Sequence, residues 1–154
     1  MASEGEQAEI AACSSFSTRI IMNYEKLAND SVFGRNARRR IESYRADVFI
    51  TVVSVQESVQ GWMALINRKR PGHDQVHAYA RFQNCIEALT KLSILPFDES
   101  AARLFENLKR QRLRCGTMDL KIAAICLVHD GLLLTRNLSD FAKVPGLRVE
   151  NWLD

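Results

Sequence analysis

The sequence lacks a hydrophobic stretch long enough to cross a membrane, because no run of about 18 apolar residues occurs in it. Its first residues, MASEGEQAEIAACSS, also lack the basic flank and apolar centre of a secretory signal peptide. We therefore expect a cytoplasmic protein that does not associate with membranes.

Paired cysteines are also missing. Cys13, Cys85, Cys115 and Cys126 form no C-x-x-C pair, the spacing typical of zinc or redox sites. Three of the four lie in or beside apolar segments, where a buried thiol packs as a small hydrophobic group. We expect reduced, structural cysteines. The sequence contains no internal repeat and no low-complexity segment.

One domain fits the length of 154 residues and the 47% hydrophobic content, which is enough for a single core. Residues 1–18 are rich in Ala, Ser and Glu and show no sustained hydrophobic period. This composition predicts a flexible N-terminal arm, followed by one folded domain over residues 19–154.

Positive charge is absent before Arg19. The first 18 residues carry only Glu4, Glu6 and Glu9, so residues 19–154 hold 21 basic and 18 − 3 = 15 acidic residues, a net charge of +6. The cations cluster at 35–40 (RNARRR), 67–70 (NRKR) and 108–114 (LKRQRLR). A single cluster is often a solvated helix end, but three in one short domain favour a polyanionic partner such as RNA.

Hydrophobic patterns predict a three-layer α/β/α sandwich with a central, mostly parallel sheet. Strands are expected at 18–23 (TRIIMN), 47–55 (DVFITVVSV), 94–97 (ILPF), 132–135 (LLLT) and near 147–152 (LRVENW). Helices are expected at 37–44, from Ser54 to Arg70, at 74–93, after Asp98 as an N-cap, and from Gly116-Thr117. The β-branched run at 47–55 is typical of a central parallel strand.

Acidic and amide side chains follow several of these strands. In open parallel sheets, ligands bind beyond the carboxyl ends of the strands. The residues in such positions are Asn23 with Glu25, Glu57, Asp119, and Asn137 with Asp140. Oxygen ligands of this kind favour Mg²⁺ or Mn²⁺. Asp119 has a simpler explanation as well, because a carboxylate in a first helical turn is stabilised by the helix dipole.

The motifs GTMDLKIAA (116–124) and LLTRNLSDFAKVPGLRVENW (133–152), with ITVVSVQESVQGW (50–62), resemble the PIN-domain ribonucleases, specifically the VapC-type toxins of bacterial toxin–antitoxin pairs. The resemblance covers about residues 18–153. It implies a PIN-like fold and an endoribonuclease that depends on Mg²⁺ or Mn²⁺. It also implies a homodimer that is inhibited by a small antitoxin protein.

The resemblance also assigns site residues. Glu57 and Asp119 match the second and third acidic positions of the family, and the fourth falls at Asn137 or at Asp140. The first position is different, because Asn23 stands where an aspartate is expected. The neutral amide should weaken metal binding and catalysis. Glu25 offers a partial replacement, and a shifted alignment that uses Ser17-Thr18 also leaves no acid there.

The catalytic group is therefore predicted as Glu57, Asp119, Asp140 and Asn23, and the metal ligands as Glu57, Asp119, Asp140 and Asn137. Side chains expected to contact RNA are Arg38, Arg39, Arg40, Arg68, Lys69, Arg70, Arg136 and Thr135. Thr135 is alternatively a local cap. Single-stranded or looped RNA is expected, because sequence-specific recognition mostly reads unstacked bases.

Two alternatives stay open. His73 and His77 have the spacing of a zinc pair, although the motif between them is poor. A catalytically degenerate PIN domain that binds RNA or an antitoxin is the stronger alternative. In either case, most apolar residues of the two middle helices are expected in the core, and some of them are expected to form a dimer seam or to receive an antitoxin helix; these residues are Trp62, Met63, Ile66, Phe82, Ile86 and Leu89.

Overall fold

The computed structural model describes residues 19–22, 32–44 and 47–152. The expected N-terminal arm (1–18), Asn23 and Glu25 lie outside the described residues.

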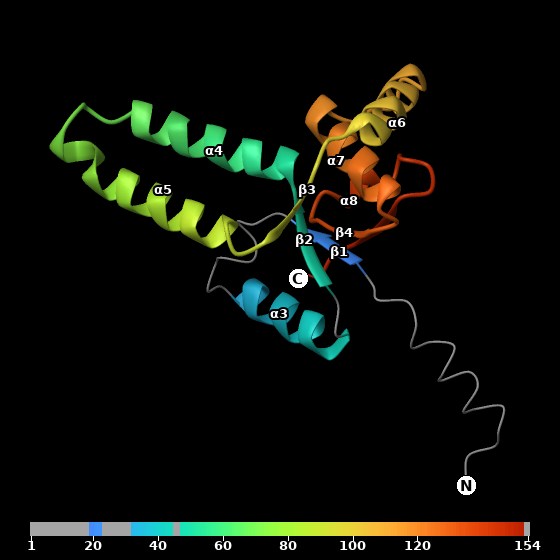
Figure 1. Cartoon of the computed structure of the whole chain (residues 1–154), viewed down its shortest axis with the longest axis horizontal. Coiled ribbons are helices and arrows are strands. Elements are labelled where there is room, and N and C mark those ends of the chain that lie inside the picture. The colour runs from blue at the N-terminus through green and yellow to red at the C-terminus, as the bar shows by residue number, and fades with distance from the viewer. Residues whose placement is uncertain (1–18, 23–31, 45–46, 153–154) are drawn as a thin grey trace, which may run out of the picture.

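Five parallel strands form one sheet in the order β3-β2-β1-β4-β5 (Figure 1). They are β1 (Arg19–Met22), β2 (Asp47–Thr51), β3 (Ser93–Leu95), β4 (Leu132–Leu134) and β5 (Arg148–Glu150). Each neighbouring pair is parallel; Ile21, for example, is in register with Phe49 on one side and Leu133 on the other. The chain leaves β1 toward β2 and returns to β4 on its other side, so β1 lies at the centre of the sheet.

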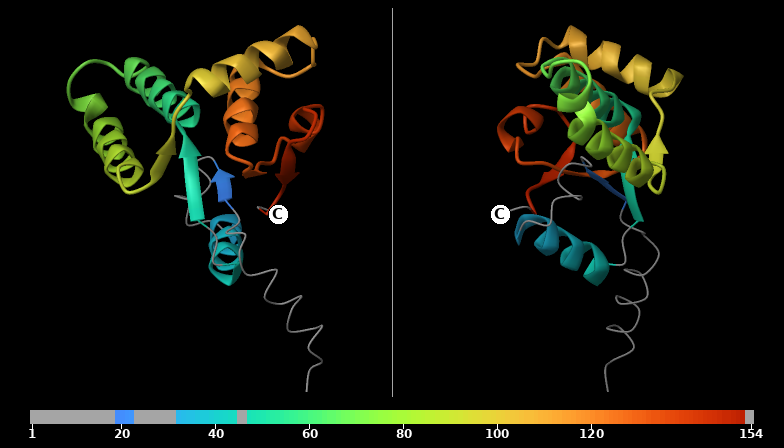
Figure 2. Two further views of the ribbon diagram at one scale, coloured as in Figure 1. Left: turned by 45° about the vertical axis from the view of Figure 1, so that its right-hand side comes forward. Right: turned by 90° about the vertical axis from the view of Figure 1, so that its left-hand side faces the viewer.

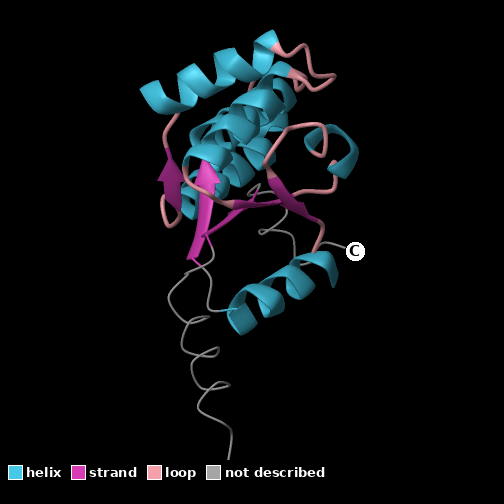
Figure 3. Cartoon of the chain, turned by 90° about the vertical axis from the view of Figure 1, so that its right-hand side faces the viewer, coloured by secondary structure: helices cyan, strands magenta, loops and turns pink. Residues whose placement is uncertain are grey.

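Helices cover both faces of the sheet (Figures 2 and 3). The helix α3 (Val32–Tyr44) lies on one face. The other face carries α6 (Glu99–Arg110), α7 (Thr117–Val128) and the short α8 (Leu138–Phe141). Between β2 and β3, α4 (Val52–Asn67) and α5 (Val76–Leu89) form a hairpin that projects away from the sheet, as Figure 1 shows. The predicted three-layer α/β/α sandwich is confirmed.

The core follows the alternation of side chains along the two central strands. Ile21 and Leu133 are buried with the residues of α6 and α7. Their neighbours on the opposite face pack with Ile41 of α3 and with Trp152; these are Ile20, Met22, Leu132 and Leu134. Side chains alternate along a strand and both faces are covered, so β4 and the last three residues of β1 are continuous apolar runs. Each fully buried Ile or Leu contributes about 1.5–3 kcal/mol.

Some predicted boundaries were wrong. The strand expected at 47–55 ends at Thr51, and α4 begins at Val52 rather than near Ser54. The Thr51 side chain accepts a hydrogen bond from the Ser54 backbone N–H at 3.0 Å, which caps the helix and ends the strand. The helix expected at 74–93 is shorter: a 3₁₀ turn (His73–Gln75) precedes α5.

The predicted N-cap of α6 is confirmed, because the Asp98 carboxylate accepts a hydrogen bond from the Ala101 N–H at 2.9 Å. In the described part of the chain, Cys85, Cys115 and Cys126 are free thiols, as expected. No helix among the described residues is long and apolar enough to span a membrane.

Candidate active site

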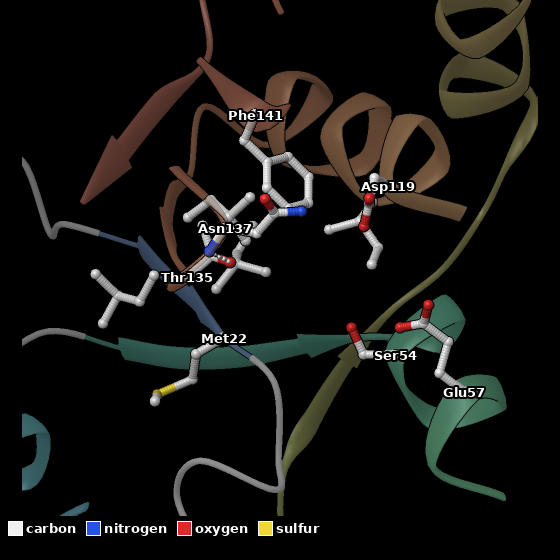
Figure 4. A pocket seen from close by; sticks show the side chains of 11 residues that line it. Met22, Ser54, Glu57, Asp119, Thr135, Asn137 and Phe141 are labelled. Carbon is white, nitrogen blue, oxygen red and sulfur yellow. Dashed lines mark hydrogen bonds between the residues drawn. The ribbon is translucent and has the colours of Figure 1, made fainter. Parts of the chain in front are cut away.

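A small cavity lies at the carboxyl edge of the sheet, where β1 and β4 end and α4 and α7 begin (Figure 4). Its volume is about 90 Å³. Polar groups from three parts of the chain face it, over an apolar floor. The lining residues are Ile21, Met22, Ser54, Glu57, Asp119, Ile122, Leu133, Leu134, Thr135, Asn137 and Phe141. Ligand sites of open parallel sheets occur at this edge.

Glu57 reaches the cavity from the second turn of α4. The start of this helix is fixed by Thr51, which is fully buried and whose hydroxyl lies 3.0 Å from both the Ser54 N–H nitrogen and the Ser54 hydroxyl oxygen. Ser54 lines the same cavity, one turn before Glu57. The buried cap therefore sets the direction in which α4 presents Glu57.

Asp119 reaches the cavity from the first turn of α7, so it also meets the positive end of the helix dipole. Figure 4 shows the carboxylates of Asp119 and Glu57 pointing into the same space from two helices. Burial raises the pKa of Asp119, and the negative charge of Asp140 raises it further. The site therefore gathers negative charge, which disfavours ionisation of Asp119.

Asp140 is held at the rim by two donors. The Lys143 ammonium donates to one carboxylate oxygen at 2.8 Å and the Asn137 side-chain amide to the other at 3.0 Å. The Lys143 hydrogen bond, then that of Asn137, then the Lys143 charge lower the pKa of Asp140. Lys143 also donates to the Arg114 carbonyl at 2.8 Å, which ties α8 to the loop before α7. Asp140 does not line the cavity itself, whereas Asn137 does.

Thr135 and Asn137 form the third side of the cavity. Thr135 is buried, and its hydroxyl accepts a hydrogen bond from the Asn137 N–H at 3.0 Å. The local cap that was the simpler explanation for Thr135 is thus present, on a residue that also faces the cavity.

The donor set suits a hard divalent cation. Two carboxylates, an amide and two hydroxyls give oxygen ligands, and no described His or Cys lines the cavity. A volume of about 90 Å³ leaves room for a cation with several waters, because a water needs only about 10–15 Å³ of such space. However, no three described His, Cys, Asp or Glu side chains are close enough to hold a metal together, His73 and His77 included.

The structure brings Glu57, Asp119, Asn137 and Thr135 of the predicted site residues to one cavity, and Asp140 to its rim. Arg39 and Arg40 lie on α3, at the opposite face of the sheet, where Arg40 lies over the Trp152 ring at 5.4 Å. Arg68, Lys69 and Arg70 lie at the end of the α4–α5 hairpin. Arg136 is exposed beside Thr135, and the side chain of Arg38 is outside the described set.

The sequence alone did not identify Ser54 and Met22 as lining residues. Ser54 fell where the expected strand (47–55) and the expected helix (from Ser54) overlap, so its place on the Glu57 face of α4 was not determined. Met22 is the last described residue of β1 and lines the cavity just before Asn23, but its side chain packs on the α3 face of the sheet.

Comparison with known proteins identifies the family. The model of the PIN domain matches residues 18–147. This chain belongs to the PIN domain family, which confirms the predicted resemblance.

Two relatives are ribonucleases by name. The chain is 41% identical over 61 residues to ribonuclease VapC1 of Rickettsia felis. The matched region covers 37% of this chain and 46% of that protein. It is 33% identical over 69 residues to ribonuclease VapC2 of Haemophilus influenzae. That matched region covers 42% of this chain and 52% of that protein. The chain thus spans about half the length of the relatives it matches.

Solved structures share the fold. VapBC2 from Rickettsia felis, bound to a DNA fragment from its promoter, has a TM-score of 0.67 at 17% identity and covers 88% of this chain and 99% of that chain. FitAcB from Neisseria gonorrhoeae has a TM-score of 0.66 at 18% identity, with coverage of 86% and 97%.

Proposed function

We propose that this protein is a divalent-metal-dependent endoribonuclease of the VapC type. One observation carries the proposal: the carboxylates of Glu57 and Asp119, which are 62 positions apart in the sequence, line a single oxygen-rich cavity at the carboxyl edge of a PIN-domain sheet. The relatives from Rickettsia felis and Haemophilus influenzae are also named ribonucleases.

In this proposal, Glu57 and Asp119 hold Mg²⁺ or Mn²⁺ directly, and Asn137 contributes its amide oxygen. The cation would supply Lewis-acid activation of water and offset the charge that develops on the scissile phosphate. Asp140 completes the negative field from the rim, held by Lys143 and Asn137. Arg136, exposed beside Thr135, contacts the phosphate backbone.

The first acidic position limits the activity. Asn23 stands where the family motif carries an acid, and Met22 beside it offers no ligand for a hard cation. A site with one carboxylate fewer should bind the cation more weakly and activate water less. This departure also favours a second candidate function, a degenerate PIN domain that binds RNA or an antitoxin without cutting.

Cleavage assays separate the two candidates. A labelled single-stranded RNA is incubated with the native chain, Asn23→Asp, Asp119→Asn and the double variant, each in Mg²⁺, Mn²⁺ and EDTA. We expect weak native cleavage that Asn23→Asp increases about tenfold or more and that Asp119→Asn and EDTA abolish. If native and Asn23→Asp proteins bind the RNA but neither cuts it, the enzyme proposal fails and the binding function stands.

The remaining assignments complete the proposal. A small antitoxin is the expected partner, because the solved neighbours include toxin–antitoxin complexes such as one from Klebsiella pneumoniae. We further propose a homodimer and a cytoplasmic location. The exposed apolar side chains of α4 and α5, Met63, Val76, Tyr79 and Ile86, are the surface available for either contact.

A further inference from the structure

A second cavity lies between the two helices of the α4–α5 hairpin. Its volume is about 360 Å³, and its lining combines two cations with an aromatic ring: Gly61, Trp62, Leu65, Arg68 and Arg81. No carboxylate is among these residues. We refer to it below as the hairpin cleft.

The hairpin cleft holds two flat groups side by side. The Arg81 guanidinium carbon lies 5.2 Å from the centroid of the Trp62 ring. Trp62 is partly buried and packs against the cluster of Ile50, Cys85 and Leu89, so the ring is anchored to the core of the hairpin. Aromatic rings and guanidinium planes are the surfaces on which unstacked nucleobases rest.

The two arginines keep their charge available. Within the described part of the chain, Arg68 and Arg81 are exposed and form no ion pair. Arg70, in contrast, pairs with Asp74 at 2.8 Å. A guanidinium without an acidic partner matches a phosphate with two parallel hydrogen bonds.

The hairpin cleft continues the surface that starts at Glu57. Gly61, Leu65 and Arg68 follow Glu57 at spacings of four, four and three residues, so all four share one face of α4. At 1.5 Å per residue, Arg68 lies about 16 Å along the helix from Glu57. A strand that passes Glu57 can therefore follow this face into the cleft.

We propose that the hairpin cleft binds one nucleotide of single-stranded RNA beyond the scissile bond. The base stacks on the Trp62–Arg81 pair, and Arg68 contacts its phosphate. This inference rests on the proposed function, because it requires an RNA that passes Glu57.

Binding to a short, fluorescein-labelled single-stranded RNA tests the cleft, measured by anisotropy in EDTA so that no cleavage occurs. Trp62→Leu keeps an apolar side chain but removes the stacking surface, so affinity should fall about tenfold without a change in salt dependence. Arg68→Gln should lower the slope of log K against log salt by about 0.7, because it removes one phosphate contact. Arg81→Gln should lower the affinity as Trp62→Leu does, because it removes part of the stacking surface. Arg110→Gln, an exposed arginine of α6, is the matched control and should change neither quantity.

Gly61→Leu tests the cleft without loosening the fold. A Cβ atom at Gly61 would meet no other atom within 4 Å, and leucine is the better helix former. The leucine side chain should fill the cleft, so RNA affinity should fall while the melting temperature stays equal or rises. RNA should also quench the tryptophan fluorescence of the native chain but not that of Gly61→Leu.

Native affinity in both Trp62→Leu and Gly61→Leu would overturn the inference. If RNA is bound and cut in that case, the nuclease proposal survives alone; if the native chain binds no RNA, both fail. Binding of a poly-glutamate peptide is measured in the same way as binding of the RNA. An equal loss of peptide and RNA affinity in Trp62→Leu would assign the cleft to an acidic protein segment and would also overturn the inference.

Discussion

At the scale of single residues, the site is defined by acidic side chains that come together from distant parts of the chain. Asp119 is partly buried near Asp140, and both effects raise its pKa. The Cys115 thiol is affected by the same negative charge. Burial raises its pKa, and the charges of Asp119 and Asp140 raise it further. Negative charge concentrated in this way costs stability until a cation arrives.

Asp119→Asn should therefore stabilise the metal-free protein at neutral pH. Because the folded state raises the pKa of Asp119, the ionised carboxylate opposes folding above that pKa, and the penalty disappears as the pH falls toward the unfolded value. Loss of the dipole interaction offsets part of the gain. We expect a higher melting temperature at pH 7 in EDTA, by less than the about 2–4 °C that 1 kcal/mol gives a domain of this size, because solvent screens the partly exposed carboxylate.

Thermal melts between pH 3 and pH 8 measure this effect, and the two proteins should converge at the acidic end. Asp74→Asn is the control, because Asp74 sits in an exposed ion pair with Arg70, which is worth about 0–1 kcal/mol. A native chain that is more stable than Asp119→Asn at pH 7 would contradict the charge argument.

Divalent metal should make the native chain more stable than Asp119→Asn, the reverse of the order expected in EDTA. Mn²⁺ at about 100 times its dissociation constant stabilises a protein that binds it only when folded by about 2.7 kcal/mol. The native chain should therefore melt roughly 5–10 °C higher with Mn²⁺. Asp119→Asn and Glu57→Gln should shift little, whereas Asp74→Asn should shift as the native chain does. Equal shifts in all four proteins would place the metal elsewhere.

The position of a residue could be anticipated from the sequence where the order of the strands alone decides it. Glu57 and Asp119 follow strands or begin helices at one sheet edge, so their meeting in one cavity could be anticipated. The bonds of Asp140 could not. The hydrogen bond from Lys143 to Asp140 depends on the position of the Lys143 side chain. This side chain also donates to the Arg114 carbonyl, 29 residues away, and no local sequence pattern encodes that contact.

At the scale of elements, the junction between β2 and α4 decides how Glu57 is presented. Thr51 is fully buried, caps α4 through Ser54 and is also in register with Leu95 of β3. The β-branched run DVFITVVSV satisfies a strand pattern through Val55, so periodicity could not locate this junction. The buried hydroxyl supplies the missing information, because it satisfies an N–H group of the first turn.

Thr51→Val should damage both stability and the site. The substitution preserves shape but leaves the buried Ser54 N–H and hydroxyl without their partner, which costs about 1–3 kcal/mol. The first turn of α4 should fray, and Glu57 should lose its fixed position. Urea unfolding and Mn²⁺ titration measure the two effects. Thr51→Ser keeps the hydroxyl and should retain native metal affinity; an equal loss of affinity in both variants would contradict the capping argument.

At the scale of the whole molecule, the order of elements predicted the three layers correctly. Alternating strands and helices, joined by right-handed crossovers, leave few arrangements other than a parallel sheet covered on both faces. The positions of the basic clusters relative to the two faces of this sheet could not be predicted from the sequence. The cluster on α3 lies on the face of the sheet opposite α6 and α7 (Figure 3), whereas Arg68 directly follows α4, the helix that carries Glu57.

RNA that binds at the site should therefore contact the basic cluster after α4 and not the basic cluster on α3. Arg39 and Arg68 are both exposed, but only Arg68 shares a face of α4 with Glu57. Arg68→Gln should lower the salt slope of single-stranded RNA binding by about 0.7, the loss of one phosphate contact, while Arg39→Gln leaves it unchanged. Both substitutions remove one charge, so a general electrostatic attraction would weaken binding equally. Equal slopes in the two variants would mean that the RNA follows the net charge of +3 rather than a path along α4.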